Sequence, residues 1–245
     1  MESVALPVYQ IRLKNRAEVA DRTIAVHLKK PAGFEFKAGQ YVDVTLLNPP
    51  QMDSQGAVRS FSIASAPYED DLVVATRIRE SAFKRVFAAL PPGSELKLQG
   101  PMGSFTLHNS PAKAAVFLAG GIGITPFRSI IRQATKEKLP HQLYLFYSNR
   151  RPEDAAFLDE LQDLSQSSAH FILIATMTEM GKSKRNWTGE RGFIDREMLV
   201  KHFCDLNEPK YYVAGSPAMV AAMQQMLMKA GVDEDNVRTE EFGGY

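Results

Sequence analysis

Residues 114–126 read AAVFLAGGIGITP, and this stretch indicates how the second half of the chain folds. The apolar run 114–119 is typical of a buried strand, and a helical pattern follows the glycines. Glycine lets the backbone approach a pyrophosphate closely, and a helix N-terminus presents unpaired N–H groups and a positive dipole end to an anion. Gly120, Gly121 and Gly123 therefore predict a phosphate-binding turn, with a plain structural turn as the alternative.

The two residues after the glycines support the phosphate-binding interpretation. Thr125 is a competent N-cap, and its hydroxyl could also contact a phosphate. Pro126 suits the first position of a helix, where its missing N–H costs nothing. We therefore expect the helix to begin at Pro126.

Strands and helices alternate from Lys113 onward. We expect strands at 114–119, 142–147, 170–176, 210–213 and 237–241, and helices at 127–138, 154–164, 195–202 and 217–230. This alternation predicts a doubly wound, parallel α/β nucleotide-binding domain over residues 110–245. The polar stretch 179–191 is expected to be a mobile surface loop.

Residues 1–109 show a different rhythm, with short strand patterns separated by turn residues. We expect strands at 8–13, 23–29, 41–47, 58–64, 72–79 and 95–99, with one amphipathic helix at 82–90. Six short strands with little helix predict an antiparallel β-barrel. The chain therefore divides into a barrel domain and an α/β domain.

Charge and cysteine content exclude several classes of function. The 29 basic and 28 acidic residues give a net charge of +1, which favours neither nucleic acid nor an anionic membrane as partner. No stretch is long and apolar enough to cross a bilayer, so a cytoplasmic protein is expected. The single cysteine, Cys204, excludes an internal disulfide and a cysteine-ligated iron–sulfur cluster. The five histidines lack ligand spacing, so no metal site is predicted.

The residues after the second expected strand of the α/β domain stand where a doubly wound fold binds the adenosine ribose of a dinucleotide. Ser148, Asn149, Arg150 and Arg151 stand where an acidic residue would select a free 2′-hydroxyl. Hydroxyl, amide and guanidinium groups instead suit a 2′-phosphate, which favours NADPH over NADH. The alternative is a solvated loop in which the nearby acidic residues 153–154 pair with the arginines.

A second candidate site precedes the first in the chain, at Arg59, Ser60, Phe61 and Ser62. A guanidinium can hold a pyrophosphate in a bidentate manner, and alternation places Arg59 and Phe61 on one face of the strand and the two serines on the other. A half-exposed strand without a ligand is the alternative. Two nucleotide sites in two domains indicate electron transfer between two cofactors.

These motifs together resemble the ferredoxin–NADP reductase superfamily. Residues 59–62 are similar to its flavin motif R-x-Y-S, residues 120–126 resemble its nicotinamide-nucleotide motif, and residues 212–219 resemble its late C-G-x-x-x-M signature. Residues 36–41 and 100–105 resemble segments that enter and close its barrel. The resemblance implies an FAD-binding barrel followed by a pyridine-nucleotide domain, without an iron–sulfur domain of its own.

The resemblance also implies roles for individual residues. Arg59 would hold the FAD pyrophosphate, Phe61 would pack along the flavin, Ser60 would belong to the same site, and Ser62 would donate a hydrogen bond near flavin N5. The nicotinamide nucleotide, NADP(H) or NAD(H), would contact residues of the glycine turn and of the late signature: Gly120, Gly121, Gly123, Thr125, Pro126, Ser148, Arg150, Arg151, Gly215, Pro217 and Met219.

Three departures from the family pattern limit the comparison. Phe61 replaces the family tyrosine, which keeps the ring but removes a phenolic hydrogen bond. Ala214 replaces the family cysteine beside the nicotinamide, so no thiol assists hydride transfer. The second pyrophosphate contact falls to Ser81 at an N-cap or to Lys84 one turn later, and the sequence does not choose between them.

The C-terminal residues supply the remaining candidates. In the superfamily a terminal aromatic commonly covers the flavin, and Phe242 or Tyr245 would fill that place, with Gly243 and Gly244 allowing displacement. Glu241 and Tyr245 join Ser62 as candidate catalytic residues. A frayed tail after an edge strand is the alternative.

The resemblance implies an FAD-dependent NAD(P)H oxidoreductase that moves hydride between NADPH and flavin N5. Electrons would then pass to a separate acceptor such as ferredoxin or flavodoxin. Two alternatives are an NADH-dependent reductase component of an oxygenase and a flavin-bearing subunit with little turnover alone. A basic rim for an acidic partner protein is expected among Lys37, Arg77, Arg79, Lys84 and Arg85, with ordinary solvated side chains as the alternative.

Overall fold

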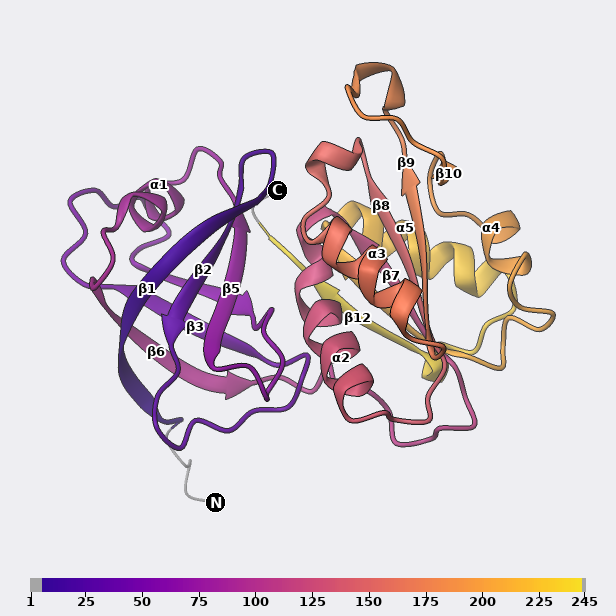
Figure 1. Cartoon of the computed structure of the whole chain (residues 1–245), viewed down its shortest axis with the longest axis horizontal. Helices are drawn as coiled ribbons and strands as arrows, with labels where there is room; N and C mark the ends of the chain where they lie inside the picture. Colours follow the sequence, from indigo (N-terminus) through magenta and orange to yellow (C-terminus); the bar gives the residue numbers. More distant parts are fainter. Residues whose placement is uncertain (1–5, 244–245) are drawn as a thin grey trace.

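Two sheets lie side by side in the computed structural model, which describes residues 6–243 (Figure 1). The first is a six-stranded antiparallel sheet with the strand order β4-β3-β6-β1-β2-β5. A bridge between Ile63 and Val74 joins the end of β4 to β5, so the sheet closes on itself as a barrel. Its elements are β1 (Val8–Ala20), β2 (Thr23–Lys29), β3 (Tyr41–Leu46), β4 (Val58–Ser62), β5 (Asp71–Arg77), α1 (Ala82–Ala89) and β6 (Glu95–Met102).

The second sheet has six parallel strands in the order β10-β9-β8-β7-β11-β12. Helices cover both of its faces, with α2 and α3 on one and α4 and α5 on the other (Figure 1). The elements are β7 (Ala115–Gly120), α2 (Ile124–Lys136), β8 (Leu143–Asn149), α3 (Leu158–Ser167), β9 (Phe171–Met177), β10 (Glu190–Arg191), α4 (Arg196–Val200), β11 (Lys210–Gly215), α5 (Pro217–Lys229) and β12 (Val237–Glu241). The predicted fold class, an antiparallel barrel followed by a doubly wound parallel domain, is confirmed.

Some elements begin or end away from their predicted positions. Strand β1 continues to Ala20 because it pairs with β6 at its start and with β2 beyond Leu13. Its residues 14–18 are all exposed, so no apolar alternation marks them. Helix α3 begins at Leu158, not at residue 154, because Phe157 takes a left-handed conformation with φ of 59°. The domain boundary proposed at 109/110 falls in the segment between β6 and β7.

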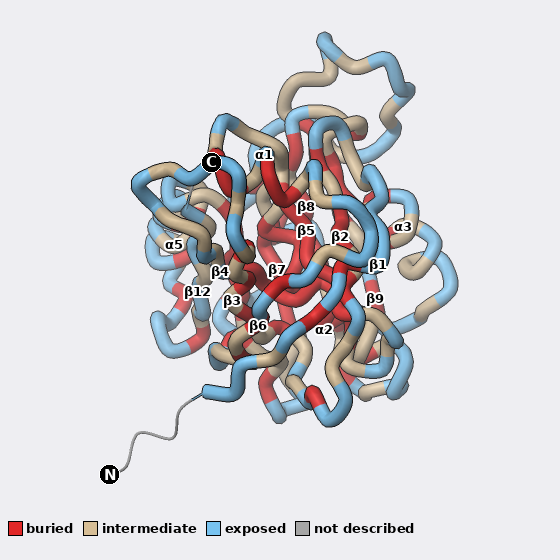
Figure 2. Tube along the Cα trace, turned by 90° about the vertical axis from the view of Figure 1, so that its left-hand side faces the viewer, coloured by how far each residue is buried: buried red, intermediate tan, exposed pale blue. Residues whose placement is uncertain are grey.

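The apolar core has separate parts inside the barrel and on each face of the parallel sheet. The buried residues of the trace follow the strands of both sheets, while loops and helix outer faces are exposed (Figure 2). Strands β7, β8 and β11 are buried on both faces, which explains why their sequences are continuous apolar runs. Among residues 6–243, no helix has the length and apolar character needed to cross a membrane.

The two domains are joined by a buried guanidinium on α2. Arg128 is 7% exposed, and its Nη1 donates to the backbone oxygen of Ala64 in the barrel at 2.7 Å. The same guanidinium contacts the carboxylates of Glu69 at 3.2 Å and Glu160 at 2.9 Å. The neighbouring Ser129 donates its hydroxyl to the Ser65 oxygen at 2.7 Å. Helix α2 is therefore fixed to the barrel by polar contacts that exclude water.

Removal of this guanidinium should destabilise the protein strongly. Arg128→Ala leaves two partly buried carboxylates and a carbonyl without a full set of partners, and we expect it to lower the free energy of unfolding by about 3 kcal/mol. Arg12→Ala is the matched control, because the Arg12–Glu95 pair is more than half exposed and should contribute less than about 1 kcal/mol. Urea denaturation measures both losses, and equal losses would contradict the assigned role of Arg128.

Candidate active site

Strand β4 carries Arg59, whose guanidinium contacts one carboxylate. Its Nη2 donates to Oδ1 of Asp53 at 3.0 Å. The other oxygen of Asp53 accepts the N–H of Ala82, the first residue of α1, at 3.0 Å, and the Ser81 hydroxyl lies 3.5 Å away. Burial would raise the pKa of Asp53, but the hydrogen bonds from Ala82, Gln55 and Arg59 lower it. A guanidinium, a helix N-terminus and a hydroxyl therefore converge on one negative group.

The residues predicted for flavin binding share one cavity of about 530 Å³. Residues from both faces of β4 line it, namely Arg59, Ser60, Phe61 and Ser62. Ser81 and Lys84 both line it, so the structure leaves both candidates for the second pyrophosphate contact in place. Burial and the nearby charges of Arg79 and Arg59 lower the pKa of Lys84.

Phe61 lines this cavity, and its ring packs among other aromatic rings. It is 8% exposed, and its ring is stacked on Phe87 with centroids 5.7 Å apart. Phe83 lies at 5.9 Å on a tilted plane. Helix α1 thus supplies the packing that holds the Phe61 ring in a fixed orientation beside Ser62.

The C-terminal strand brings a carboxyl group to Ser62. The Ser62 hydroxyl lies 3.5 Å from Oε2 of Glu240, on the last strand β12, although the two residues are far apart in sequence. Burial raises the pKa of Glu240 to about 7, and the hydrogen bond from Ser62 opposes that rise only in part. The sequence pointed to Glu241, which is exposed at the rim of the same cavity. The carboxyl that contacts Ser62 belongs to Glu240, which the sequence did not identify as a site residue.

Phe242 connects the two domains at this point. Its backbone N–H donates to the oxygen of Gly215 at 2.9 Å, while its side chain lines the cavity beside Ser62. Gly243 lines the same cavity. The other aromatic candidate, Tyr245, and the adjacent Gly244 lie outside the described residues.

The glycine turn packs tightly against strand β11 and helix α5. A Cβ at Gly120 would lie 2.0 Å from the sulfur of Met219, and one at Gly123 would lie 2.2 Å from the backbone oxygen of Ala214. Gly121 has a φ of 52°, a conformation that side chains disfavour. The backbone therefore requires glycine at Gly121 and Gly123, whereas at Gly120 the flexible Met219 side chain would have to move.

The predicted start of the helix was wrong by two residues. Helix α2 begins at Ile124 with Gly123 as its N-cap, so Thr125 is not the N-cap and Pro126 is not the first helical residue. The Thr125 hydroxyl donates to the oxygen of Ile122 at 3.1 Å. The short 3₁₀ turn Gly121–Gly123 runs directly into the helix and leaves no separate capping position.

A larger cavity, of about 600 Å³, lies over the carboxyl ends of the parallel strands. It brings together Gly120 and Gly121 from the turn, Ser148 and Arg150 from the end of β8, and Met219 from α5. Gly215 ends β11 and Pro217 begins α5, whose N-cap is Ser216. In open α/β sheets this edge is where nucleotides bind.

Arg151 does not share this cavity with Arg150. Its guanidinium donates to Asp154 at 2.8 Å and to Asp21 of the barrel at 3.0 Å. The pairing with an acidic neighbour, which the sequence left open, is the arrangement that the structure contains. Arg151 therefore ties the end of β8 to the β1–β2 turn.

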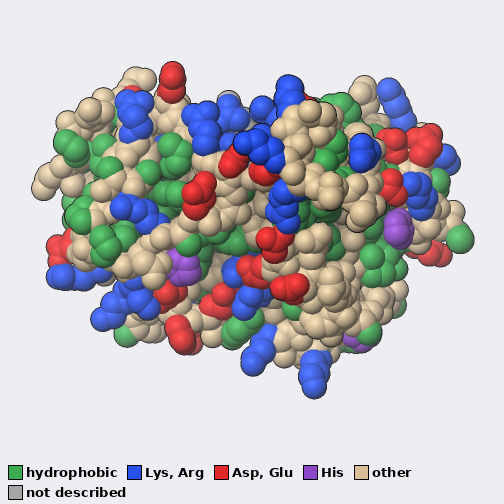
Figure 3. All heavy atoms as spheres, turned by 45° about the horizontal axis from the view of Figure 1, so that its top comes forward, with side chains coloured by type: hydrophobic (Ala, Val, Ile, Leu, Met, Phe, Trp, Pro, Cys, Tyr) green, Lys and Arg blue, Asp and Glu red, His purple; other side chains and the backbone are tan. Residues whose placement is uncertain are grey.

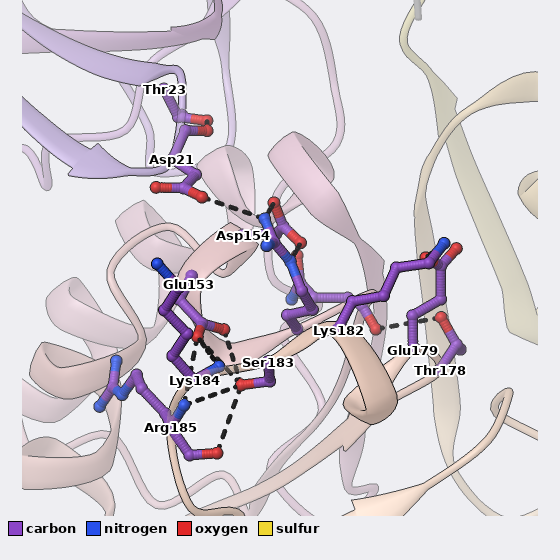
Figure 4. Close-up of polar contacts among 12 residues, drawn as sticks. Asp21, Thr23, Glu153, Asp154, Thr178, Glu179, Lys182, Ser183, Lys184 and Arg185 are labelled. Atoms are coloured by element: carbon purple, nitrogen blue, oxygen red, sulfur yellow. Dashed lines mark hydrogen bonds and ion pairs between the residues drawn. The ribbon is translucent and has the colours of Figure 1, made fainter.

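The polar loop 179–191 is attached to the same region through Glu153. One carboxylate oxygen of Glu153 accepts the backbone N–H of Lys184 at 2.8 Å, and the Ser183 hydroxyl donates to the carboxylate at 2.9 Å (Figure 4). Burial would raise the pKa of Glu153, but these backbone and hydroxyl donors lower it to about 2. The sequence predicted a mobile surface loop here. In the structure, β10 at its end pairs with β9, and Glu153 holds Ser183 and Lys184 by hydrogen bonds.

Comparisons with known proteins agree with this arrangement. The family model "Oxidoreductase NAD-binding domain" matches residues 117–225. The ferredoxin–NADP reductase B of Sorangium cellulosum is 30% identical over 219 residues, which cover 85% of this chain and 86% of that protein. The chain belongs to the ferredoxin–NADP reductase superfamily.

Other members differ in length. The reductase component of propane 2-monooxygenase from Mycolicibacterium smegmatis is 30% identical, with 97% of this chain and 69% of that protein covered. The glycine betaine monooxygenase reductase subunit of Chromohalobacter salexigens is 29% identical, and the match spans 91% of this chain but 60% of that subunit. A ferredoxin–NADP⁺ reductase from Neisseria gonorrhoeae has the same fold, with a TM-score of 0.79 at 22% identity over 96% of this chain and 98% of that one.

Several residues line the site although the sequence did not identify them as site residues. Arg77 and Arg79, expected as a rim for a partner protein, line the nucleotide cavity. Phe193, from the segment after β10, is 77% exposed at the edge of that cavity. Asp53 and Glu240 complete the set. An aromatic residue in a polar stretch of sequence could have identified Phe193. No local sequence pattern identifies Asp53 or Glu240.

The raised pKa of Glu240 predicts a pH-dependent stability. The folded protein holds the proton more tightly than the unfolded chain, in which the pKa of this carboxyl is about 4.5. The stability of the wild type relative to Glu240→Gln should therefore be constant below pH 4.5 and fall by about 3 kcal/mol as pH rises to about 7. Urea denaturation across this range measures the difference. Parallel curves for the two proteins would show that Glu240 titrates normally.

Proposed function

We propose that this chain is an FAD-dependent NAD(P)H oxidoreductase that transfers electrons to a separate acceptor. The observation that carries the proposal is a small cavity at the domain junction. Residues of the flavin motif, Arg59 to Ser62, line it together with Ile122 and Thr125 from the glycine turn and the start of α2. Groups suited to a flavin and to a nicotinamide nucleotide therefore face one another across a single space.

The donor set around Asp53 fits the pyrophosphate of FAD. Arg59, the N-terminus of α1 and Ser81 already surround one anionic group there, and Lys84 lies in the same cavity. Phe61 offers a ring held by Phe87 against which a flavin can pack. When bound, FAD would supply the conversion of a two-electron donor into one-electron steps.

The nicotinamide nucleotide is assigned to the cavity over the parallel strands. The glycine turn would approach its pyrophosphate, with Gly120 and Gly121 on the cavity wall, and helix α2 begins directly after the turn at Ile124. Phe193 offers an exposed aromatic face on which the adenine can stack. Ser148 and Arg150 would hold the ribose end.

Ser62 and Glu240 can hold a proton at the junction. The Ser62 hydroxyl is 4% exposed and contacts Oε2 of Glu240, whose pKa of about 7 allows it to carry or release a proton near neutral pH. Ala214 brings no thiol to this place, so Ser62 and Glu240 are the polar side chains assigned to proton handling. Phe242, beside them, shields the space from water.

The proposed acceptor is a protein such as ferredoxin or flavodoxin, because residues 1–245 contain one cysteine and a cysteine-ligated iron–sulfur cluster needs four. A second candidate is an NADH-dependent reductase component of an oxygenase. It is favoured by the names of two of the relatives above, which are reductases of a propane and a glycine betaine monooxygenase.

Anaerobic mixing of the FAD-loaded protein with NADPH or NADH tests the proposal. Rapid loss of the visible flavin absorbance with either coenzyme is expected. Faster loss with NADH would favour the oxygenase reductase. Absence of bleaching with both would overturn the oxidoreductase function and favour a flavin-bearing subunit without turnover of its own.

The assignment of Arg59 makes a separate prediction about FAD binding. Arg59→Gln removes the bidentate donor and should weaken FAD binding at least about tenfold, because a hydrogen bond to a charged group contributes about 1.5–3 kcal/mol. Quenching of flavin fluorescence on titration of the apoprotein measures the affinity. Arg12→Gln, on the exposed surface of β1, removes the same charge and should leave the affinity unchanged. Equal affinities for wild type and Arg59→Gln would place the pyrophosphate elsewhere.

A further inference from the structure

A second cavity, of about 520 Å³, adjoins the nucleotide cavity at the domain junction. The two share Arg77, Arg79 and Arg150 in their walls, so they lie next to one another. We call the second one the interdomain arginine cavity. Its walls come from the β1–β2 turn, the end of β5 and the segment after β8, and its lining residues are Asp21, Arg22, Arg77, Ile78, Arg79, Glu80, Arg150, Arg151 and Asp154.

Backbone contacts fix these three segments to one another. The N–H of Ile78 donates to the oxygen of Arg22 at 2.7 Å, which holds the β1–β2 turn against the end of β5. The N–H of Asp21 donates to the oxygen of Glu153 at 2.7 Å, which holds the same turn against the α/β domain. Side chains from both domains therefore reach a common space in a defined arrangement.

The lining of the interdomain arginine cavity has an excess of positive charge. Five arginines and three carboxylates line it, which leaves two positive charges without a negative partner in the wall. Lys and Arg side chains are also numerous near the upper middle of the face shown in Figure 3, with Asp and Glu side chains among them. A dianion would neutralise this excess.

The arginines divide into an engaged group and an available group. Arg151 pairs with both Asp21 and Asp154, and Arg77 donates to the Asp154 backbone oxygen at 2.8 Å. Within residues 6–243, the structure contains no hydrogen bond or ion pair from the side chains of the other three arginines, which are Arg22, Arg79 and Arg150. Two of these three come from the barrel.

We propose that Arg22 and Arg79 of the barrel, together with Arg150, bind the 2′-phosphate of NADPH. This inference rests on the proposed function, since the adenosine must lie in the adjoining cavity. A phosphate monoester carries a charge of about −1.5 to −2 at neutral pH, which matches the excess in the wall. Guanidinium groups bind such a phosphate through two parallel hydrogen bonds.

The coenzyme choice is therefore made by both domains. NADH would leave the excess positive charge of the wall without a compensating anion, whereas the additional phosphate of NADPH would neutralise it. Arg151, which the sequence favoured as a phosphate ligand, acts instead by holding the β1–β2 turn in place through Asp21. Arg22 and Arg79 are the specificity-determining residues that the α/β domain alone does not contain.

Calorimetric titration of the FAD-loaded protein with two nucleotides tests this inference without turnover. The probes are 2′-phospho-AMP and 5′-AMP, which differ by the one phosphate. The wild type should bind 2′-phospho-AMP at least about tenfold more tightly. Arg22→Gln and Arg79→Gln should each reduce that ratio severalfold, and together they should bring it close to one. Arg12→Gln is the matched control, because it removes an exposed arginine that lines neither cavity and should leave the ratio intact.

Each other outcome has a definite meaning. If both variants keep the wild-type ratio, or if both nucleotides lose affinity equally, Arg22 and Arg79 do not bind the 2′-phosphate and the inference is overturned while the nucleotide site stands. Equal binding of the two nucleotides by the wild type overturns it as well. If neither nucleotide binds the wild type, the proposed function fails and the inference fails with it. Thermal unfolding of the single variants confirms that each one is folded.

Discussion

The site depends on the contact of one buried guanidinium with two domains. Arg128 lies on α2, immediately after the glycine turn, and donates to the barrel backbone at Ala64. The cavities assigned to the two cofactors meet at Ser62 on one side and at Ile122 and Thr125 on the other. A shift of α2 relative to the barrel would separate these walls. The contacts of Arg128 therefore fix the distance between the two cofactor sites.

The sequence predicted the architecture well because the two halves of the chain have different periodicities. Apolar runs such as 114–119 identify strands that are buried on both faces, and the turn residues before position 100 identify short antiparallel strands. It predicted boundaries less well where tertiary contacts decide. The extension of β1 depends on pairing with β2, and the start of α3 depends on the left-handed Phe157. Neither feature has a local sequence signal.

The same distinction applies to the site residues. Motifs located Arg59, Ser62, the glycines and Arg150, and the structure brings them to the same junction. The choice between Glu240 and Glu241 needed the register of β12 against β11, in which Glu240 is opposite Ala214. The fate of Arg151 needed the position of Asp21, which lies 130 residues earlier in the chain. The sequence identifies the candidate residues, but only the folded structure shows which other residues they contact.

The packing of the glycine turn has a chemical consequence for a protein that handles electrons. The thioether of Met219 lies against Gly120 and Gly215 so closely that not even a methyl group fits between them, and the same side chain lines the nucleotide cavity. Oxidation to the sulfoxide would add a polar oxygen to this sulfur. That oxygen has no room on the side of the turn and would project into the space assigned to the coenzyme. Oxidation of this one sulfur would thus place a polar group inside the space proposed for the coenzyme.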